Sequence, residues 1–390
     1  MAGVDRTKGG GGTAPGAPAE PDDGGAGGVS GVNLGALRSH NTALVLDLLR
    51  TAGPEGISRL ELAERTGLTP QAVSKITARL REEGLAAEAG RRASTGGKPR
   101  TVLRLVPEAG HAVGVHLDRD ELTVVLCDLT GAVVARRTAA LDLGAGADTV
   151  VERAVGEVTA IAGDDGPPGA VLGVGVALPG PLDHRRGVLH RVTGFPEWNG
   201  FPLRDVLARR LSLPVVVDKD TNAAALGLAV EGAAGNFASF AYLHFGAGLG
   251  GGLVIGGAVH RGARTGAGEF GHQVVQLDGP PCECGNRGCV EALCLAAVAR
   301  GDLAEAARVL GTAAGNLAAL LDVDLVLLGG RTIAAAPGTF VRGVTAVLEE
   351  RAGRAGEDAV PVRVASGAGQ GVAEGAAQLL LAPLFGRAEG

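Results

Sequence analysis

The sequence predicts a mixed α/β protein in which a small helical domain with a β-hairpin precedes a larger body of two α/β lobes. Residues 34–106 carry three short helix-forming segments followed by an alternating strand pattern. From residue 107 onward, strands come in groups and are followed by alternating helices and strands, and this succession occurs twice. With 390 residues, 46% of them apolar, the chain is long enough for two or three domains.

The first 33 residues differ in composition from the rest of the chain. They are dominated by Gly, Ala, Pro and Asp and cannot bury enough apolar surface to offset the entropy of ordering, so we expect a disordered tail at 1–33. The chain contains no apolar run of 18 residues, and its N-terminus lacks the apolar stretch of a signal peptide. These features predict a cytoplasmic protein without a membrane partner.

Capping residues define the first two helices of the small domain, which we expect at 34–106. Leucines at helical spacing in 37–50 predict a first helix, and Gly53-Pro54 ends it. Ser58, with a glutamate three residues later, forms the capping box of a second helix. Gly67 ends this helix in the left-handed conformation typical of helix C-termini.

A third helix and a hairpin complete this domain. Thr69 followed by Pro70 is a cap with proline at the first helical position, so we expect a helix from there through about Glu83. A Ser-Thr-Gly-Gly turn at 94–97 and the alternating strand 101–106 then predict a β-hairpin with a basic tip. Three helices followed by such a hairpin are typical of a winged helix-turn-helix.

Charge favours DNA as the partner of this domain. Residues 34–106 hold 12 Lys and Arg against 7 Asp and Glu, whereas residues 107–390, which we call the body, hold 22 against 31. Polar side chains near the start of the third helix can contact base edges in the major groove, and basic side chains can contact phosphates. The alternative is a protein-interaction module with an ordinary charged face. The candidate DNA contacts are Thr69, Gln71, Ser74, Lys75, Arg79, Arg91, Arg92, Lys98 and Arg100.

The body reads as two α/β lobes with a cleft between them. Its segments alternate between buried strand patterns and amphipathic helix patterns. The expected strands are 112–117, 122–129, 132–137, 171–177, 215–217 and 326–330, with a glycine-interrupted hairpin at 240–257. The expected helices are 148–163, 203–211, 221–229, most of 291–321, and 371–381.

A cluster of histidine and cysteines gives the most specific chemical signal. His272, Cys282, Cys284 and Cys289 are spaced H-x9-C-x1-C-x4-C, and three thiolates with one imidazole make a closed four-coordinate site that favours a structural Zn²⁺. The two remaining cysteines of the chain are expected to be buried and inert. The alternatives are a zinc knuckle without a ligand pocket, or cysteines that merely fill a core.

Two carboxylates flank the cluster without being needed for the metal. Glu269 precedes His272 and Glu291 follows Cys289, so a metal-braced loop would hold both carboxylates in a position to accept hydrogen bonds from a polyol. The sequence therefore predicts a sugar-type pocket beside the zinc site.

From about residue 37 to its C-terminus, the chain resembles transcriptional regulators of the ROK family, which groups repressors, open reading frames and sugar kinases. The motifs that carry the resemblance are 62–74, AlaLeuProGlyProLeuAsp at 177–183, GlyGluPheGlyHis at 268–272 and Cys-x-Cys-Gly-x-x-Gly-Cys-x-Glu at 282–291. The resemblance implies an actin-like, ribonuclease-H-like two-lobed body with a structural zinc and a sugar or sugar derivative in the cleft. It also implies a homodimer or homotetramer on palindromic operator DNA.

The resemblance implies sugar contacts from Asp220, Glu269, His272 and Glu291, with Asn199 as a weaker pocket candidate. Where sugar-binding relatives have an asparagine before the aspartate, this chain has Lys219. A lysine is longer, charged and cannot accept a hydrogen bond. An acidic or phosphorylated sugar, or a pocket that has lost its ligand, therefore stays open.

The phosphate loops of the family's kinases are altered. A kinase is expected to carry Asp-x-Gly-Gly-Thr after the first strand of the body, but this chain has the acidic run 118–122, and Gly246-Ala247-Gly248 replaces a Gly-Thr-Gly. Missing glycines and additional acids disfavour phosphate binding. We therefore expect a sugar-responsive DNA-binding regulator, most simply a repressor of carbohydrate genes, and no enzyme. The alternatives are an ATP-dependent sugar kinase with an appended DNA-binding module, and a regulator whose effector is a protein.

Overall fold

A computed structural model describes residues 40–94, 97–163, 169–192, 194–235, 237–365 and 371–387. The tail predicted at 1–33 and the tip of the predicted hairpin at 95–96 lie outside the described residues. In the part that is described, no helix combines the length and the apolar character needed to cross a bilayer.

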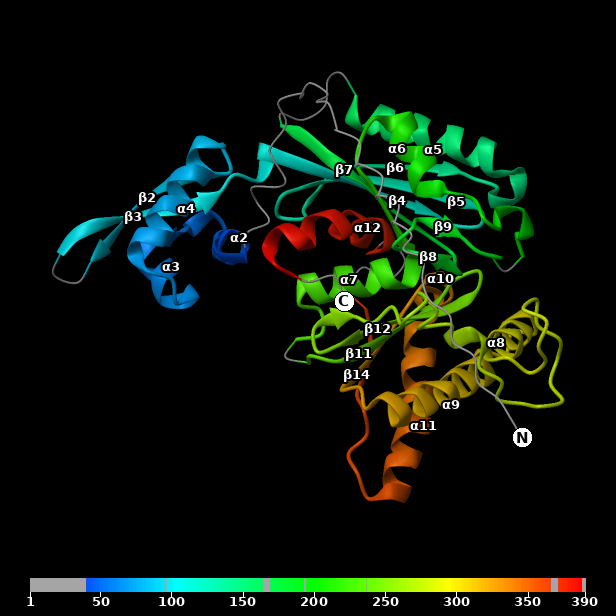
Figure 1. Ribbon diagram of the computed structural model, residues 1–390. Helices are drawn as coiled ribbons and strands as arrows, with labels where there is room; N and C mark the ends of the chain where they lie inside the picture. Colours follow the sequence, from blue (N-terminus) through cyan, green and yellow to red (C-terminus); the bar gives the residue numbers. More distant parts are fainter. Residues whose placement is uncertain are drawn as a thin grey trace, which may run out of the picture. The chain divides into compact units, whose positions relative to one another are not determined.

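The N-terminal part is a winged helix-turn-helix, as the sequence predicts (Figure 1). Three helices are followed by a hairpin that extends beyond them, and a short strand pairs with the second hairpin strand, giving the sheet order β1-β3-β2. The elements are α2 (His40–Ala52), η1 (Gly53–Glu55), β1 (Ile57–Ser58), α3 (Arg59–Thr66), α4 (Pro70–Glu82), β2 (Ala86–Ser94) and β3 (Gly97–Leu105).

The predicted caps are present at both turns. The Ser58 hydroxyl accepts a hydrogen bond from the Glu61 amide at 3.3 Å, and the Glu61 carboxylate accepts one from the Ser58 amide at 2.9 Å. Gly67 ends α3 with φ 70° in the left-handed region. Thr69 caps α4 by accepting a hydrogen bond from the Ala72 amide at 3.3 Å. These local interactions set the start of α3 and of α4, and they fix the turn between the two helices.

Ser58→Ala is expected to lower the local stability of α3 by about 1 kcal/mol, because it removes one half of the capping box. The reduced stability is measured as faster amide hydrogen exchange in α3 of the full chain. Ser74→Ala is the matched control, since Ser74 is exposed within α4. Equal exchange in the two variants would contradict a stabilising role for the cap.

The first lobe of the body is built on a five-stranded sheet with the order β10-β7-β4-β5-β6. Two helices, α5 and α6, cover its outer face, and small elements connect β7 to α6 (Figure 1). The larger elements are β4 (Gly110–Leu117), β5 (Glu121–Asp128), β6 (Val133–Ala140), α5 (Ala147–Ala162), β7 (Ala170–Leu178), α6 (Leu203–Leu211) and β10 (Val215–Lys219). The smaller ones are η2 (Pro107–Ala109), η3 (Leu143–Ala145), β8 (Leu182–Asp183), β9 (Val188–Leu189) and η4 (Pro196–Trp198).

The second lobe repeats this plan with the sheet order β13-β12-β11-β14-β15. Segment 331–365, for which the sequence patterns above predict no element, contains α10, α11 and β15. The elements are β11 (Phe240–Phe245), β12 (Leu249–Ile255), β13 (Ala258–Val259), η5 (Phe270–His272), α8 (Val290–Ala299), α9 (Leu303–Leu321), β14 (Leu325–Gly329), α10 (Arg331–Ala335), α11 (Pro337–Ala355) and β15 (Val362–Val364).

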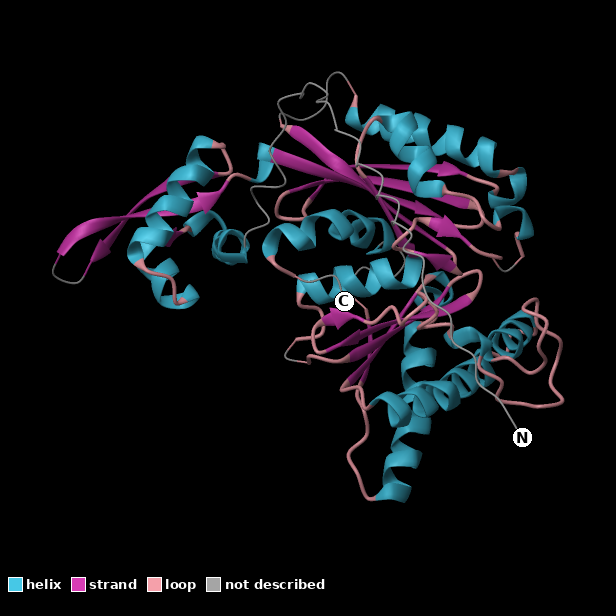
Figure 2. Ribbon diagram, viewed as in Figure 1, coloured by secondary structure: helices cyan, strands magenta, loops and turns pink. Residues whose placement is uncertain are grey.

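Two helices lie between the sheets, α7 (Asp220–Glu231) and α12 (Gly371–Leu381) (Figure 2). Glycines allow the close approach of α12 to the first sheet. A Cβ on Gly114 in β4 would collide with the carbonyl of Ala373, and one on Gly175 in β7 with that of Ala376. The two-lobed α/β architecture predicted from the sequence is therefore confirmed.

The C-terminal turn η6 (Ala382–Phe385) packs against α2 of the winged helix. Leu384 and Phe385 share one apolar core with Val45 and Leu49 of α2. The Arg50 guanidinium lies 5.1 Å from the centroid of the Phe385 ring. This contact follows directly after α12, so it joins the interlobe helices to the N-terminal domain.

Candidate functional site

The first candidate site is the exposed face of α4. Thr69, Gln71, Ser74 and Lys75 are exposed, while Val73 and Leu80 are fully buried and Ile76 is half-buried. This division agrees with the helical spacing read from the sequence. It leaves a polar and basic face near the N-terminus of α4, which is the part of a recognition helix that can contact base edges.

Arg79 differs from the other residues of the predicted DNA-contact set. Its guanidinium donates a hydrogen bond to the Thr42 hydroxyl at 2.8 Å and lies 3.8 Å from the Glu83 carboxylate. The side chain therefore ties α4 to α2, so a contact with DNA would compete with these bonds. A DNA contact by Arg79 stays a prediction.

The basic hairpin is only partly described. Arg91 and Arg100 are exposed, and the backbone register places Arg92 opposite Arg100. The side chains of Arg92 and Lys98 lie outside the described residues. Because Arg91 is paired with Thr101, Arg91 and Arg100 lie on opposite faces of the hairpin, and each is a basic side chain of the kind that contacts DNA phosphates.

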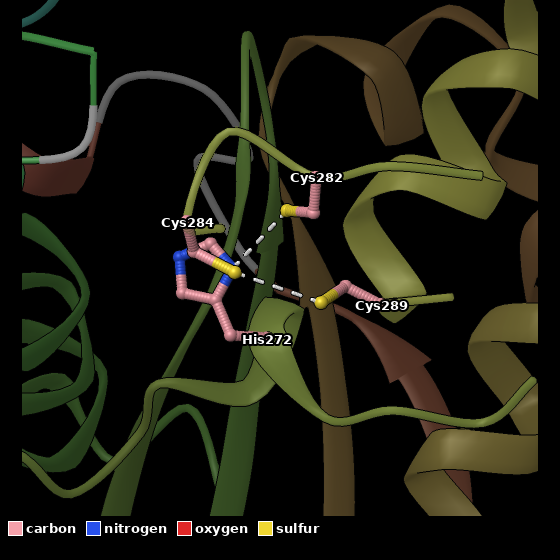
Figure 3. Close-up of side chains that lie close together, drawn as sticks. All are labelled: His272, Cys282, Cys284 and Cys289. Atoms are coloured by element: carbon pink, nitrogen blue, oxygen red, sulfur yellow. Dashed lines mark hydrogen bonds between the residues drawn. The ribbon is translucent and has the colours of Figure 1, made fainter. Parts of the chain in front are cut away.

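The four predicted ligand residues form a compact cluster (Figure 3). Their ligand atoms all lie within 4.8 Å of one another. The Sγ atoms of Cys284 and Cys289 are 3.7 Å apart, and His272 Nδ1 lies 3.7 Å from Cys282 Sγ. Ligands at about 2.3 Å from a tetrahedral Zn²⁺ would be separated by roughly 3.8 Å. The cluster could therefore hold a metal ion such as zinc.

Backbone hydrogen bonds shape the loop that carries the cysteines. The Cys282 amide donates to the Asn286 carbonyl at 2.8 Å, and the Gly285 amide donates to the Cys282 carbonyl at 2.9 Å. Gly285 and Gly288 have φ of 96° and 66°, which favours glycine at both positions. Cys289 then begins α8 as its N-cap residue. The loop that carries the cysteines thus leads directly into the helix that carries Glu291.

The two other cysteines lie in the protein core. Cys127 and Cys294 are fully buried. Burial raises the pKa of the Cys127 thiol to about 12, and it raises the pKa of the Cys294 thiol to about 12. Both thiols are therefore protonated near neutral pH and unreactive.

A cleft between the lobes lies beside the metal cluster. Asp220, Glu269, His272 and Glu291 all line it, as the family resemblance implies. Its free volume is about 90 Å³, well below the roughly 300–1,000 Å³ typical of small-molecule pockets. Asn199 is exposed at the end of η4 and is not among the described residues that line the cleft. Its role in ligand binding stays a prediction without structural support.

The acids of the cleft are held by backbone amides. Glu291 is buried, and its Oε2 accepts a hydrogen bond from the Leu249 amide at 2.7 Å. Asp220 accepts one from the Thr221 amide at 2.6 Å. These bonds fix the orientation of each carboxylate and leave lone pairs for a hydroxyl donor in the cleft.

The ammonium group of Lys219 is a buried positive charge in the lining of the cleft. Its ammonium donates to a carboxylate oxygen of Glu269 at 2.9 Å and to the Ala267 carbonyl at 2.5 Å. Its side chain is only 3% exposed. One of the predicted sugar-binding acids is therefore already paired within the chain. The lysine could be noticed in the sequence, but its partner, 50 residues further along, could not.

The acidic run 118–122, where the family resemblance would place a kinase phosphate loop, is tied to the second lobe by an ion pair. Asp120 accepts two hydrogen bonds, at 3.0 and 3.1 Å, from Arg331 at the start of α10, and this pair joins the two lobes. Arg119 lines the cleft and lies 3.8 Å from Glu283. A carboxylate supplies no donor for an anionic phosphate.

A second buried ion pair was not predicted by any sequence pattern. Asp218, next to Lys219 in β10, accepts a hydrogen bond from Arg261 at 2.7 Å and another from Asn222 at 2.9 Å. Both partners of the ion pair are almost fully buried. Their 43-residue separation and the absence of a motif explain why the sequence alone does not reveal them.

Two stretches of the chain match family models. Residues 112–297 match the model described as ROK family, and residues 54–86 match the model described as winged helix-turn-helix DNA-binding. Among curated proteins, the chain is 30% identical over 242 residues to the xylose repressor of Caldicellulosiruptor bescii, covering 60% of this chain and 59% of the relative. It is 31% identical over 265 residues to the DNA-binding transcriptional dual regulator NagC of Escherichia coli (strain K12), covering 67% of this chain and 64% of the relative.

Solved structures share the architecture. A ROK family transcriptional regulator described as a homolog of the E. coli MLC protein has a TM-score of 0.71 at 21% identity, covering 89% of this chain and 98% of that one. A ROK family glucokinase from Streptomyces griseus, in complex with glucose and AMPPNP, has a TM-score of 0.58 at 26% identity, covering 70% of this chain and 99% of that one. Regulators and kinases thus share this fold.

The chain spans about three fifths of the length of the curated relatives first matched. The matched stretches nevertheless include α3 and α4 of the winged helix-turn-helix and the body segment from β4 into α8, which contains the His272 and cysteine cluster. Residues 112–297 thus match the ROK family, and this ROK-type body follows an N-terminal winged helix-turn-helix.

Proposed function

We propose that this protein is a sugar-responsive DNA-binding transcriptional regulator, acting as a repressor of carbohydrate genes and lacking kinase activity. One observation carries the proposal: a winged helix precedes a ROK body whose cleft keeps acids suited to sugar hydroxyls but has lost the glycines of a phosphate loop. The names of the relatives, a xylose repressor and NagC, support it. The winged helix, 34–106, would bind operator DNA, and the body, 107–390, would bind the effector.

In this proposal, α4 lies in the major groove and the hairpin contacts the flanking backbone. Gln71 and Ser74 would contact base edges, and Lys75, Arg91 and Arg100 would contact phosphates. Thr69, Arg79, Arg92 and Lys98 complete the proposed interface. A homodimer or homotetramer would place two such helices on half-sites about 34 Å apart.

We propose Zn²⁺ as the ion of the cluster, because three thiolates and one imidazole match a structural zinc site. The ligands would be His272, Cys282, Cys284 and Cys289. The ion would supply no chemistry beyond bracing. Its role would be to fix the loop and the start of α8, and with them the positions of Glu269 and Glu291 at the cleft.

The sugar would bind between Asp220, Glu269 and Glu291, whose oxygens accept hydrogen bonds from hydroxyls. To enter, it would have to displace the Lys219 ammonium from Glu269 and enlarge a cleft of about 90 Å³. Movement of the lobes would reach the winged helix through α12 and η6, which packs against α2. A sugar shifts this equilibrium only if its affinity differs between the DNA-competent form and the other form.

Lys219→Asn is expected to raise the affinity for neutral sugars by about tenfold, because it removes a buried competitor for Glu269 and restores an acceptor. Calorimetry with a panel of pentoses and hexoses measures the change in the full chain. Lys75→Asn, on the exposed face of α4, is the matched control. If neither the wild type nor Lys219→Asn binds any sugar while DNA binding persists, the effector is a protein and the cleft is vestigial.

The rival function is an ATP-dependent sugar kinase with an appended DNA-binding module, favoured by the likeness to the glucokinase fold. Asp220 would be its general base. A coupled assay with ATP and the same sugar panel separates the two functions. We expect no sugar-dependent ADP release. Steady release that Asp220→Asn abolishes would replace the regulator with the kinase.

A further inference from the structure

A second cavity, separate from the sugar cleft, lies on the other face of β10. Its volume is about 540 Å³, within the range of small-molecule pockets. Successive side chains of a strand point to opposite faces, so Lys219 lines the cleft while Asp218 lines this cavity. The cavity also borders η6, the turn that packs against the winged helix.

The cavity is rich in arginine. Arg185, Arg204, Arg261 and Arg387 line it, and Asp218 is the one carboxylate among its described lining residues. His184 lines it as well, with its Nδ1 2.8 Å from the Thr265 hydroxyl, and burial lowers the pKa of this imidazole. With the charge of Asp218 balanced by one arginine, the lining keeps a clear positive excess.

Arg261 lines the cavity, and one of its guanidinium nitrogens is buried without a described partner. The residue is 6% exposed, and its Nε donates to Asp218 at 2.7 Å. Its Nη1 is buried and has no hydrogen-bond partner among the described residues. Asp218 Oδ1 accepts from Asn222 and from the Lys219 amide, and Asp218 Oδ2 accepts from Arg261 Nε. A buried guanidinium nitrogen without an acceptor is costly, and a ligand oxygen in the cavity would satisfy it.

The guanidinium groups of Arg204 and Arg387 make contacts with which a ligand would compete. Arg204 donates to the Arg185 carbonyl at 2.8 Å and pairs with Asp205 at the surface. Arg387 makes only long contacts, at 3.4 and 3.5 Å, with the last carbonyls of α7, and its Nε lies 3.7 Å from Asp47 of α2. Several guanidinium groups around one buried donor form an arrangement that binds phosphate oxygens in a forked geometry.

We propose that this cavity binds a small phosphate monoester. The phosphate would accept hydrogen bonds from Arg261 Nη1 and from the Arg185 and Arg204 guanidinium groups. The organic part would lie against the apolar wall, which includes Val215, Leu226 and Leu379. A dianionic phosphate matches the positive excess of the lining better than a single carboxylate. The site is independent of the sugar cleft and of the proposed repressor function.

Calorimetry on the full zinc-loaded chain tests the site with glycerol 3-phosphate, inorganic phosphate and glycerol. We expect glycerol 3-phosphate to bind more tightly than phosphate, and glycerol not to bind. Arg185→Ala combined with Arg204→Ala is expected to lower the affinity about tenfold or more, because the variant cannot form two of the charge-assisted hydrogen bonds. Arg186→Ala is the matched control, since Arg186 is exposed and not among the described lining residues.

Arg261→Lys supplies an independent check on the buried donor. The lysine keeps a positive charge beside Asp218, but it lacks the additional nitrogen that would donate to the ligand. The affinity for glycerol 3-phosphate is therefore expected to fall, while the thermal midpoint changes little. Absence of heat with both phosphates, or equal weakening by Arg186→Ala, would overturn the site. Loss of phosphate binding in Lys219→Asn, with the Arg185 and Arg204 variants unaffected, would assign the anion to the sugar cleft instead.

Discussion

Replacing Cys284 with serine is expected to reduce bound zinc from one equivalent to near zero and to destabilise the body by roughly 3–5 kcal/mol. Structural zinc sites in small peptides have apparent binding free energies of about 10–16 kcal/mol, all of which contributes to folding. Here part of the loop is also held by its own hydrogen bonds, from Cys282 to Asn286 and from Gly285 to Cys282, so the destabilisation is a fraction of that value. For a body of this size, the thermal midpoint would fall by about 10 °C.

The measurement combines metal analysis with thermal unfolding, before and after treatment with a chelator. Cys294→Ser is the matched control, because Cys294 is buried in the same helix that follows the loop but is not a member of the cluster. It is expected to retain full zinc. Unchanged stability of the wild type after complete removal of the metal would refute the bracing role.

The second large effect is expected from removing three basic side chains of the proposed DNA interface. The triple variant Lys75→Ala, Arg91→Ala, Arg100→Ala is expected to flatten the dependence of log K on log salt by up to about 2.7, because each phosphate that a cation neutralises adds about 0.9 to the slope. All three side chains are exposed, so folding is expected to be unaffected. Fluorescence anisotropy with a promoter fragment at several salt concentrations gives the slope.

Arg300→Ala is the matched control for this experiment, because Arg300 is an exposed arginine of the body. It is expected to leave the slope unchanged. A triple variant whose slope equals that of the wild type would remove α4 and the hairpin from the interface. The DNA-binding surface would then lie elsewhere on the chain.

The winged helix could be predicted closely from the sequence because its signals are local. The capping box of Ser58 and Glu61, the glycine at 67 and the cap at Thr69 each act within a few residues. Side chains so close together meet whatever the remaining chain does. The same holds for the metal cluster, whose cysteines lie on one short loop.

What the sequence did not reveal depends on contacts between distant segments. Lys219 meets Glu269, and Asp218 meets Arg261, only after β10 has been placed beside the loops of the second lobe. The position of Arg79 on the helix is typical of an arginine that contacts DNA, but its guanidinium donates a hydrogen bond to Thr42 on another helix. Local patterns identify which side chains are available, and tertiary packing decides which of them are already paired.

The two cavities differ in how far local sequence motifs identify their lining residues. Asp220, Glu269, His272 and Glu291 all line the cleft, and three of them, Glu269, His272 and Glu291, lie in motifs that carry the family resemblance. The arginine-lined cavity has no motif, because its residues come from six separate segments of the body. Only their arrangement in space suggests a ligand.

The most direct test is a titration of the purified full-length protein against fragments of the promoter of its own gene, followed by addition of the sugar panel to the bound complex. We predict that the protein binds one fragment with strong salt dependence, and that at least one sugar or sugar derivative changes the affinity of the protein for this fragment. Failure to bind any promoter fragment, together with consumption of ATP when hexoses are supplied, would contradict it.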